Sequence, residues 1–320
     1  METAPRASPA PPAPIDKWPP LPLKTWEDTY ATLHMWTQIV GKTRLALAPS
    51  MNHWWQVPLY VSTCGLTTSP IPSGTRTFEV EFDFLAHLLR VRTSDGAERT
   101  LALRPRSVAD FYGEYREALR SLDLEVRMRP VPVEVVVAVP FAEDRDHASY
   151  DAGAAQRCFR ALVQIDRVMK EFRGRFQGKC SPVHFFWGSF DLACTRFSGR
   201  RAPIHPGGAP NCPDYVMHEA YSHECASAGW WPGGGGMSEA AFYAYAYPEP
   251  KALGDAAILP RGAYYHRDLR EFILPYEAVR TAANPDEALL SFLQSTYDAS
   301  ANLAGWDRNA LERRKESREA

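Results

Sequence analysis

The sequence HWWQVPLYV at residues 53–61 recurs in altered form as HFFWGSFDL at residues 184–192. In both stretches two aromatic residues follow a histidine, and each histidine lies nineteen residues before a proline, Pro72 or Pro203. Each stretch also follows a run of apolar residues at helical spacing. A match of this kind at a fixed separation indicates an internal repeat.

The residues after each stretch extend the similarity. FEVEFDF at 78–84 and FYAYAY at 242–247 alternate as strands with one buried face do. A helix is predicted to follow each, the first opening at Ser107 and the second capped by Asn284, with Pro285 in its first turn. Both halves are therefore predicted to run helix, antiparallel strands, helix.

These halves predict an α+β fold with an internal duplication. We expect repeat one at about residues 25–130 and repeat two at about 154–305. Exposed strand edges favour pairing between the halves about a pseudo-twofold axis, which would give one continuous sheet or a barrel. The prediction is a single globular domain over residues 18–308, preceded by a disordered Pro/Ala-rich segment, 1–17, and followed by a charged tail, 309–320.

Composition restricts the kind of partner. The 320 residues carry 36 basic and 38 acidic side chains, a net charge of −2, which argues against nucleic acid as a partner. No apolar run reaches the ~20 residues of a membrane helix, so no membrane association is expected. The six cysteines are scattered, which favours a reduced, cytoplasmic protein. The glycine run 233–236 lacks the setting of a dinucleotide fingerprint, so we expect no nucleotide cofactor.

The second half carries an insertion. Thirty-eight residues separate Pro203 from Phe242, whereas five separate Pro72 from Phe78. Residues 213–228 contain no helix-breaking residue after Pro213 and are predicted to form one inserted helix. A long insertion of this kind often covers a site.

The inserted segment carries HEAYSHE at residues 218–224. On a helix, Glu219 and His223 would share a face. With His184 they would form a two-histidine, one-carboxylate set for a divalent metal, Zn, Fe or Mn. Without a metal, Glu219 or Glu224 could exchange protons with His223 as a general acid and base. A third interpretation is an ordinary surface pair between Glu219 and His223.

Other residues are candidates for contacts with a substrate. Aromatic side chains would favour an organic, partly apolar molecule, and an arginine suits a carboxylate or phosphate. The candidates for substrate binding are His53, Trp187, Arg196, Trp231 and Tyr245. A structural role is the alternative for each.

Four segments of the chain, 52–55, 182–192, 219–224 and 292–306, resemble a family of bacterial and fungal proteins known only as a domain of unknown function. The resemblance covers about residues 18–308. It implies one full-length domain without a membrane anchor. It implies no reaction, cofactor or catalytic residue.

We therefore expect a cytoplasmic small-molecule enzyme whose pocket lies between the halves under the inserted helix. The predicted catalytic residues are His184, Glu219, His223 and Glu224. A hydrolase, a lyase and a non-haem metal oxidoreductase all suit such residues. The alternative is a non-catalytic protein that binds a small molecule in an aromatic cavity. The sequence does not indicate the oligomeric state.

Overall fold

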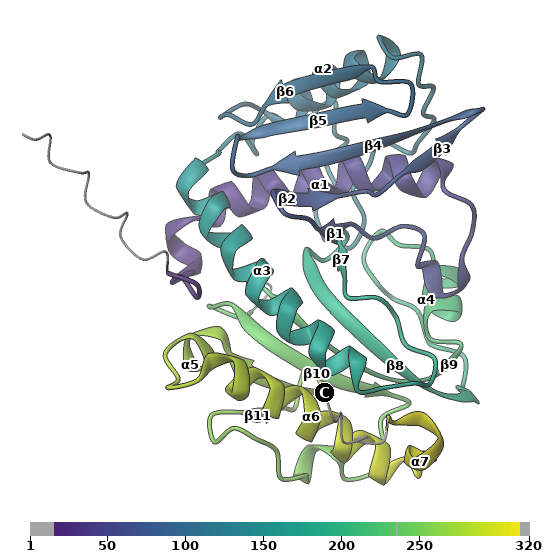
Figure 1. The fold of residues 1–320 in the computed structure, drawn as a ribbon, viewed down its shortest axis with the longest axis vertical. Coiled ribbons are helices and arrows are strands. Elements are labelled where there is room, and N and C mark those ends of the chain that lie inside the picture. The colour runs from purple at the N-terminus through teal and green to yellow at the C-terminus, as the bar shows by residue number, and fades with distance from the viewer. Residues whose placement is uncertain (1–15, 235, 314–320) are drawn as a thin grey trace, which may run out of the picture.

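Two antiparallel sheets, stacked along the long axis of the molecule, organise the fold (Figure 1). The computed structural model describes residues 16–234 and 236–313. In sheet 1 the strand order is β1-β2-β4-β5-β6, with β3 beside β4. These strands are β1 (Tyr60–Val61), β2 (Gly65–Thr67), β3 (Ile71–Ser73), β4 (Arg76–Asp83), β5 (Leu88–Thr93) and β6 (Glu98–Ala102).

Sheet 2 has the order β11-β12-β10-β9-β8-β7. Its strands are β7 (His184–Phe186), β8 (Asp191–Arg201), β9 (His223–Trp231), β10 (Ala241–Tyr247), β11 (Tyr264–His266) and β12 (Glu271–Pro275). The mixed α+β fold with antiparallel strands that the sequence predicts is thus confirmed.

Helices precede and follow the strands in each half of the chain (Figure 1). They are α1 (Glu27–Leu47), α2 (Val108–Arg120), α3 (Ala152–Gly174), α4 (Asp214–Ala220), α5 (Tyr276–Arg280), α6 (Pro285–Leu303) and α7 (Arg308–Leu311), with 3₁₀ turns η1 (Leu23–Thr25), η2 (Asn52–Trp54) and η3 (Leu253–Asp255). The predicted starts of α2 and α6 are confirmed. The Ser107 hydroxyl accepts a hydrogen bond from the Asp110 amide (3.1 Å), and the Asn284 side chain accepts one from the Glu287 amide (3.3 Å).

In the described residues, one backbone bridge joins the two halves where the sheets meet. Leu59 and Phe185 exchange both backbone hydrogen bonds, with N–O distances of 2.8 and 2.7 Å. Both side chains are fully buried. In the described part of the chain the sheets neither merge into one continuous sheet nor close into a barrel, so those two predicted arrangements are wrong.

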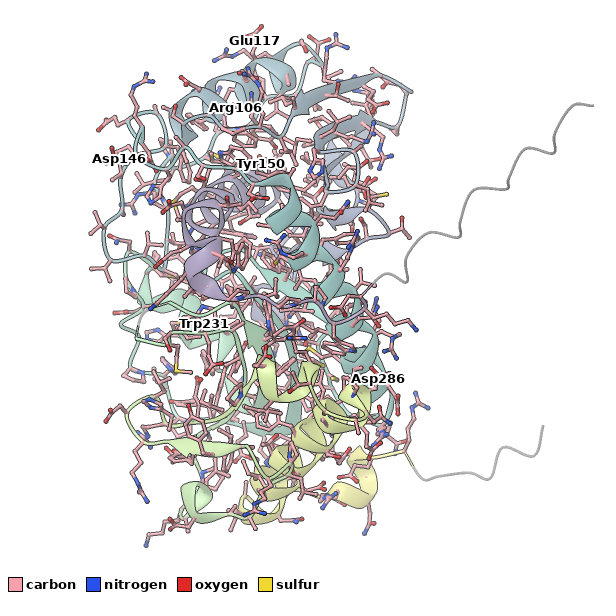
Figure 2. The ribbon with its side chains drawn as sticks, turned by 90° about the vertical axis from the view of Figure 1, so that its left-hand side faces the viewer. Arg106, Glu117, Asp146, Tyr150, Trp231 and Asp286 are labelled. Atoms are coloured by element: carbon pink, nitrogen blue, oxygen red, sulfur yellow. The ribbon has the colours of Figure 1, made fainter. Side chains whose placement is uncertain are left out.

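One cluster of buried apolar side chains extends from α1 and sheet 1 to α3, α6 and sheet 2. Trp36 of α1 stacks on Phe111 of α2 with ring centroids 4.6 Å apart. Trp230 of β9 is fully buried in the second half. Figure 2 shows Trp231, the next residue, near the middle of the long axis and just below α1.

The predicted inserted helix over 213–228 is wrong in extent. Only Asp214–Ala220 is helical, and His223–Trp231 forms the strand β9. Residues 223–231 form a strand and not a helix because β8 and β10 provide backbone hydrogen-bond partners on both sides. The small residues Ala226, Ala228 and Gly229 fit a strand at the centre of a sheet, where bulky neighbours press from both faces.

The chain ends differ from the predicted bounds. Residues 1–15 of the predicted disordered segment lie outside the described residues. Of the predicted tail, residues 309–313 pack on the domain, since the Tyr297 hydroxyl donates to Glu312 (3.0 Å) and the Arg313 amide donates to the Arg175 carbonyl (3.0 Å). Residues 314–320 lie outside the described part. In the described residues, every helix is too short or too polar to cross a bilayer.

Candidate active site

Alternation along β10 gives sheet 2 two different faces. Phe242 and Ala244 point to the side that is buried under helices, whereas Tyr243, Tyr245 and Tyr247 point to the other side and stay partly exposed. We call this second side the tyrosine face. The β8 and β9 residues in register with the three tyrosines also lie on it, namely Ala193, Thr195, Phe197, Cys225, Ser227 and Gly229.

Asp191, the first residue of β8, is the central acid on this face. The Tyr243 hydroxyl donates a short hydrogen bond to its Oδ2. Burial is the main cause that raises the pKa of Asp191 to about 7, the hydrogen bond from Tyr243 opposes this shift, and the nearby charges of Glu134 and Glu271 contribute to it. At neutral pH this carboxyl is therefore both a proton donor and a proton acceptor.

Two further carboxyl groups lie near enough to interact with Asp191. Burial raises the pKa of Glu271, at the start of β12, to about 7. Glu134 is exposed, and its carboxylate accepts a hydrogen bond from the Ser189 hydroxyl. Among the described residues, none of these three acids forms an ion pair with a lysine, arginine or histidine.

Tyrosine hydroxyls complete the cluster. Tyr221, which follows α4, shares a hydrogen bond of 2.7 Å with Tyr245. Burial raises the pKa of both phenols, so both stay protonated at neutral pH. The His205 ring stacks on Tyr221 with centroids 4.6 Å apart. We call Glu134, Asp191, Tyr221, Tyr243, Tyr245 and Glu271 the tyrosine–carboxyl cluster.

Gly229 of β9 allows Tyr243 to reach Asp191. A Cβ atom at this position would lie 2.4 Å from the Tyr243 hydroxyl oxygen and 2.6 Å from the Leu192 carbonyl oxygen. The absence of a side chain therefore lets the phenol cross β9 toward β8. The strand register places the glycine directly opposite both Tyr243 and Ala193.

The predicted catalytic residue His184 lies opposite Ala193 of the tyrosine face, in the edge strand β7, and forms no hydrogen bond with the tyrosine–carboxyl cluster. It is fully buried in β7 beside Phe186, with ring centroids 4.5 Å apart, and neither ring nitrogen has a hydrogen-bond partner among the described residues. Burial lowers its pKa to about 3, so the ring is neutral.

Glu219 and His223 do not share the predicted helix face. Glu219 lies in the last turn of α4 and is exposed, whereas His223 and Glu224 begin β9 and point to opposite sides of it. The Glu224 carboxylate accepts hydrogen bonds from Ser198 (2.9 Å) and Arg200 (2.8 Å). The argument for a shared face failed because the chain changes from helix to strand between residues 220 and 223.

The proposed metal ligands His184, Glu219 and His223 are not brought together. Within residues 16–234 and 236–313, no three His, Cys, Asp or Glu side chains are placed to hold one metal ion. A divalent metal held by fewer protein ligands stays a prediction.

The predicted substrate-binding residues divide into two groups. Tyr245 belongs to the tyrosine–carboxyl cluster, and Trp231 ends β9 on the same face. Trp187 and Arg196 are buried and structural in their contacts. The Trp187 indole donates to the Val57 carbonyl (2.9 Å), and the Arg196 guanidinium lies 3.5 Å from the centroid of the Phe172 ring. His53 lies in a separate cluster, described below.

Sequence reasoning missed Asp191, Glu271 and Glu134. The alternation of FYAYAY did place Tyr243 on one strand face with Tyr245 and Tyr247, although only Tyr245 was predicted to bind substrate. Asp191 and Glu271 each open a strand, a position at which a polar residue is common. Only their three-dimensional surroundings reveal the raised pKa values.

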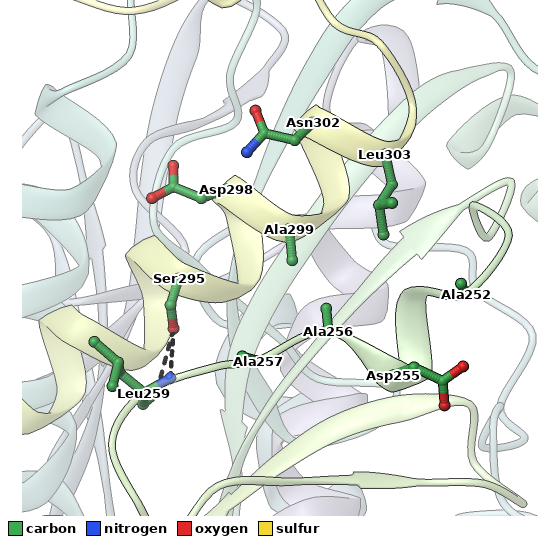
Figure 3. Close-up of a pocket in the computed structure, with 10 residues that line it drawn as sticks. All are labelled: Ala252, Asp255, Ala256, Ala257, Leu259, Ser295, Asp298, Ala299, Asn302 and Leu303. Atoms are coloured by element: carbon green, nitrogen blue, oxygen red, sulfur yellow. Dashed lines mark hydrogen bonds between the residues drawn. The ribbon is translucent and has the colours of Figure 1, made fainter.

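A hollow in the surface lies elsewhere. An open groove of about 590 Å³ runs between α6 and the segment around η3 (Figure 3). Alanine and leucine side chains line it together with Ser295, Asn302, Asp255 and Asp298. We place the candidate site at the tyrosine–carboxyl cluster instead, because both acids of the groove are paired with arginines, Asp255 with Arg267 (3.8 Å) and Asp298 with Arg308 (2.6 Å).

The fold and the cluster together define an α+β protein with unpaired carboxyl groups on one face of a sheet. The chain belongs to the "Family of unknown function (DUF5996)", whose profile matches residues 18–313. The resemblance to such a family is thus confirmed. No curated protein and no solved structure matches the chain.

Proposed function

We propose that the protein is a small-molecule enzyme that transfers protons at the tyrosine–carboxyl cluster. The observation that carries this proposal is Asp191, a carboxyl group with a pKa of about 7 that is bonded to Tyr243 and has no cationic partner among the described residues. Shifted carboxyl groups of this kind concentrate at catalytic sites. A reaction of the hydrolase or lyase class suits such a group.

Each member of the cluster has a distinct role in this proposal. Asp191 takes up and returns the proton, and Tyr243 orients its carboxyl oxygen. Glu271 supplies a second carboxyl group with a pKa of about 7. Tyr221 and Tyr245 present hydroxyls to polar groups of the substrate, while Trp231 offers apolar surface. The substrate is therefore a small organic molecule.

A library of small metabolites, tested for binding by thermal shift at about pH 7, examines this proposal. Each ligand found is then incubated with the full chain and followed by mass spectrometry. We expect Asp191→Asn to reduce turnover by at least about 100-fold, as for loss of a general acid–base group. Glu117→Gln, on the exposed side of α2, is the matched control and should leave turnover unchanged.

Two results would contradict the enzyme. Ligands that bind in a Tyr245-dependent manner and are never converted would indicate the non-catalytic binding protein instead. Turnover that survives Asp191→Asn would place the chemistry elsewhere. Elemental analysis of the same preparation tests the predicted divalent metal, since a stoichiometric Zn, Fe or Mn would add a ligand set that the cluster does not contain.

We also infer that the two halves arose by duplication. Leu59 and Phe185, which pair with each other at the junction, are 126 positions apart, and the same offset carries α1 onto residues 153–173, inside α3. This offset of 126 residues is five residues smaller than the offset of 131 that aligns His53 with His184. Superposition of α1–β2 on α3–β8 by a twofold rotation through the Leu59–Phe185 pair tests it. A different rotation would contradict the duplication.

We propose a cytoplasmic location as well. All six cysteines are free thiols, and the sulfur atoms of Cys180 and Cys194 lie 3.7 Å apart without a bond. A pair in contact stays reduced in a reducing compartment. Fractionation of cells that produce the tagged full chain tests this location, and recovery outside the cytoplasm would contradict it.

A further inference from the structure

A second cluster of polar side chains lies at the opposite end of the tyrosine face. His53, in η2, is buried with 4% of its surface exposed. Its Nδ1 contacts the carbonyl oxygens of Glu219 (3.1 Å) and Ala220 (3.0 Å) at the end of α4. Because both partners are acceptors, Nδ1 carries the proton. The Nε2 atom on the other side of the ring is buried and has no partner among the described residues.

Aromatic rings and a lysine surround this histidine. The His53 ring lies 4.4 Å from the Phe197 ring and 5.3 Å from the Trp55 ring, measured between centroids. The Lys179 ammonium lies over the same two rings, 5.4 Å from the centroid of Phe197 and 5.7 Å from that of Trp55. A cation above aromatic faces is stabilised by them, and their planes also suit a flat organic group.

Two further basic residues join the cluster from the sheet. The His223 ring is 5.7 Å from the His53 ring, and Arg201 lies opposite His223 in the β8–β9 ladder. Lys179 and His223 are partly exposed and Arg201 is exposed, so solvent reaches this end of the face. We call His53, Trp55, Lys179, Phe197, Arg201 and His223 the histidine–lysine cluster.

No acidic group within the described chain forms an ion pair with Lys179, Arg201, His53 or His223. The nearest acid along β9, Glu224, points to the other side and is held by Arg200. On α4 the side chains of His218 and Glu219 are both exposed. Burial and the neighbouring Lys179 lower the pKa of both His53 and His223.

We propose that the histidine–lysine cluster binds a small organic anion, an anionic oxygen group carried on a planar apolar body. Lys179 and Arg201 hold the charge, and His223 and the Nε2 atom of His53 donate hydrogen bonds once the rings are protonated. Trp55, whose side chain is partly exposed, contacts the planar body. A bound anion balances the positive charge of the four basic groups. It also accepts a hydrogen bond from the Nε2 atom of His53, which otherwise has no partner among the described residues. This site is separate from the tyrosine–carboxyl cluster and does not depend on the proposed enzyme.

Calorimetric titration of the full chain with benzoate, phenyl phosphate and inorganic phosphate tests the site. We expect phenyl phosphate or benzoate to bind at least tenfold more tightly than inorganic phosphate, and the tighter of the two identifies the anionic group. Lys179→Gln and His223→Gln should each weaken binding by about tenfold, the effect of one charge-assisted hydrogen bond. Lys251→Gln, on the exposed surface beyond β10, is the matched control and should bind as the wild type does.

The pH dependence gives an independent readout. Benzoate stays a monoanion between about pH 8 and about pH 6, whereas His53 and His223 gain protons as the anion binds. Binding should therefore tighten by about threefold or more as the pH falls across that range, and His223→Gln should reduce this effect. Asp191→Asn should leave benzoate binding unchanged, which separates this site from the proposed enzyme.

Three outcomes would overturn the proposal. The first is no binding of either aromatic anion below about 10 mM. The second is equal weakening by Lys179→Gln and the control Lys251→Gln. The third is an affinity that rises with pH.

Discussion

A single residue, Asp191, makes the free energy of unfolding depend on pH. Its pKa is raised in the folded chain to about 7, whereas the unfolded value is about 3.9. The folded state therefore binds the proton more tightly, and the stability that this provides is present below about pH 4 and is lost as the pH rises to about 7.

We expect Asp191→Asn to remove this loss. The free energy of unfolding of the wild type should fall, relative to the variant, by about 2 kcal/mol between about pH 5 and about pH 8. Urea unfolding at the two pH values measures the difference. The Glu117→Gln variant serves as control, because this glutamate is exposed and pairs only with Arg120. Parallel pH profiles for Asp191→Asn and wild type would show that Asp191 titrates normally.

Single residues also show where sequence reasoning reaches its limit. Trp231 and Tyr245 were predicted to bind substrate because aromatic residues favour organic ligands, and both lie on the tyrosine face. Asp191 was not predicted, because its acidity depends on burial against β9 and β10, partners that are more than 30 positions away. A sequence shows that a carboxyl group exists and not how much water surrounds it.

Strand β9 is the element on which the candidate site depends. Gly229→Ala would place a methyl group against the Tyr243 hydroxyl and the Leu192 carbonyl, and a backbone atom cannot move aside cheaply. We expect a loss of about 1–3 kcal/mol in the free energy of unfolding, together with displacement of the phenol from Asp191. Urea unfolding measures the first effect and the pKa of Asp191 reports the second.

Helix α2 provides the matched control for this substitution. Gly113 is exposed in the interior of the helix, and a Cβ atom there would meet no other atom within 4 Å. Gly113→Ala should therefore stabilise the protein by about 0.5–1 kcal/mol, since alanine loses less backbone entropy in a helix. Destabilisation at Gly113 as large as that at Gly229 would show that the clash is not the cause.

Elements with strong local signals were predicted well, and β9 was not. The starts of α2 and α6 follow from side-chain caps, which are interactions within four residues. In contrast, HECASAGWW has no helix breaker before Gly229 and forms a strand because β8 and β10 flank it. The period-two pattern of His223, Cys225 and Ser227 was the available signal, and it was weak beside the helical propensity of residues 214–220.

The whole molecule should unfold as one unit. A single buried apolar cluster connects both sheets, so neither half can lose its packing alone. We expect urea transitions followed by tryptophan fluorescence and by far-ultraviolet circular dichroism to coincide. Leu59→Ala should shift both transitions together by about 2–4 kcal/mol, the cost of truncating a fully buried leucine. Two separated transitions would show that the halves are independent domains.

At this scale the sequence predicted the order of elements in both halves but not how the halves join. The alternating strands and the capped helices are local features of the sequence. They predict the order helix, strands, helix in each half of the chain. Whether the edges close into a barrel depends on how much backbone pairs between the two halves, and in the described residues Leu59, just before β1, pairs with Phe185 of β7 alone. No local pattern encodes that number.

The tyrosine face places its acids and its bases at opposite ends of β8. Asp191 begins the strand and Phe197, beside His53 and Lys179, lies six residues on, a distance of about 20 Å along the strand. This separation is more than twice the screening length of about 8 Å that mobile ions set at physiological salt, so the exposed charges of the histidine–lysine cluster act only weakly on Asp191. The face can therefore hold two ligands at once, one at each end of β8.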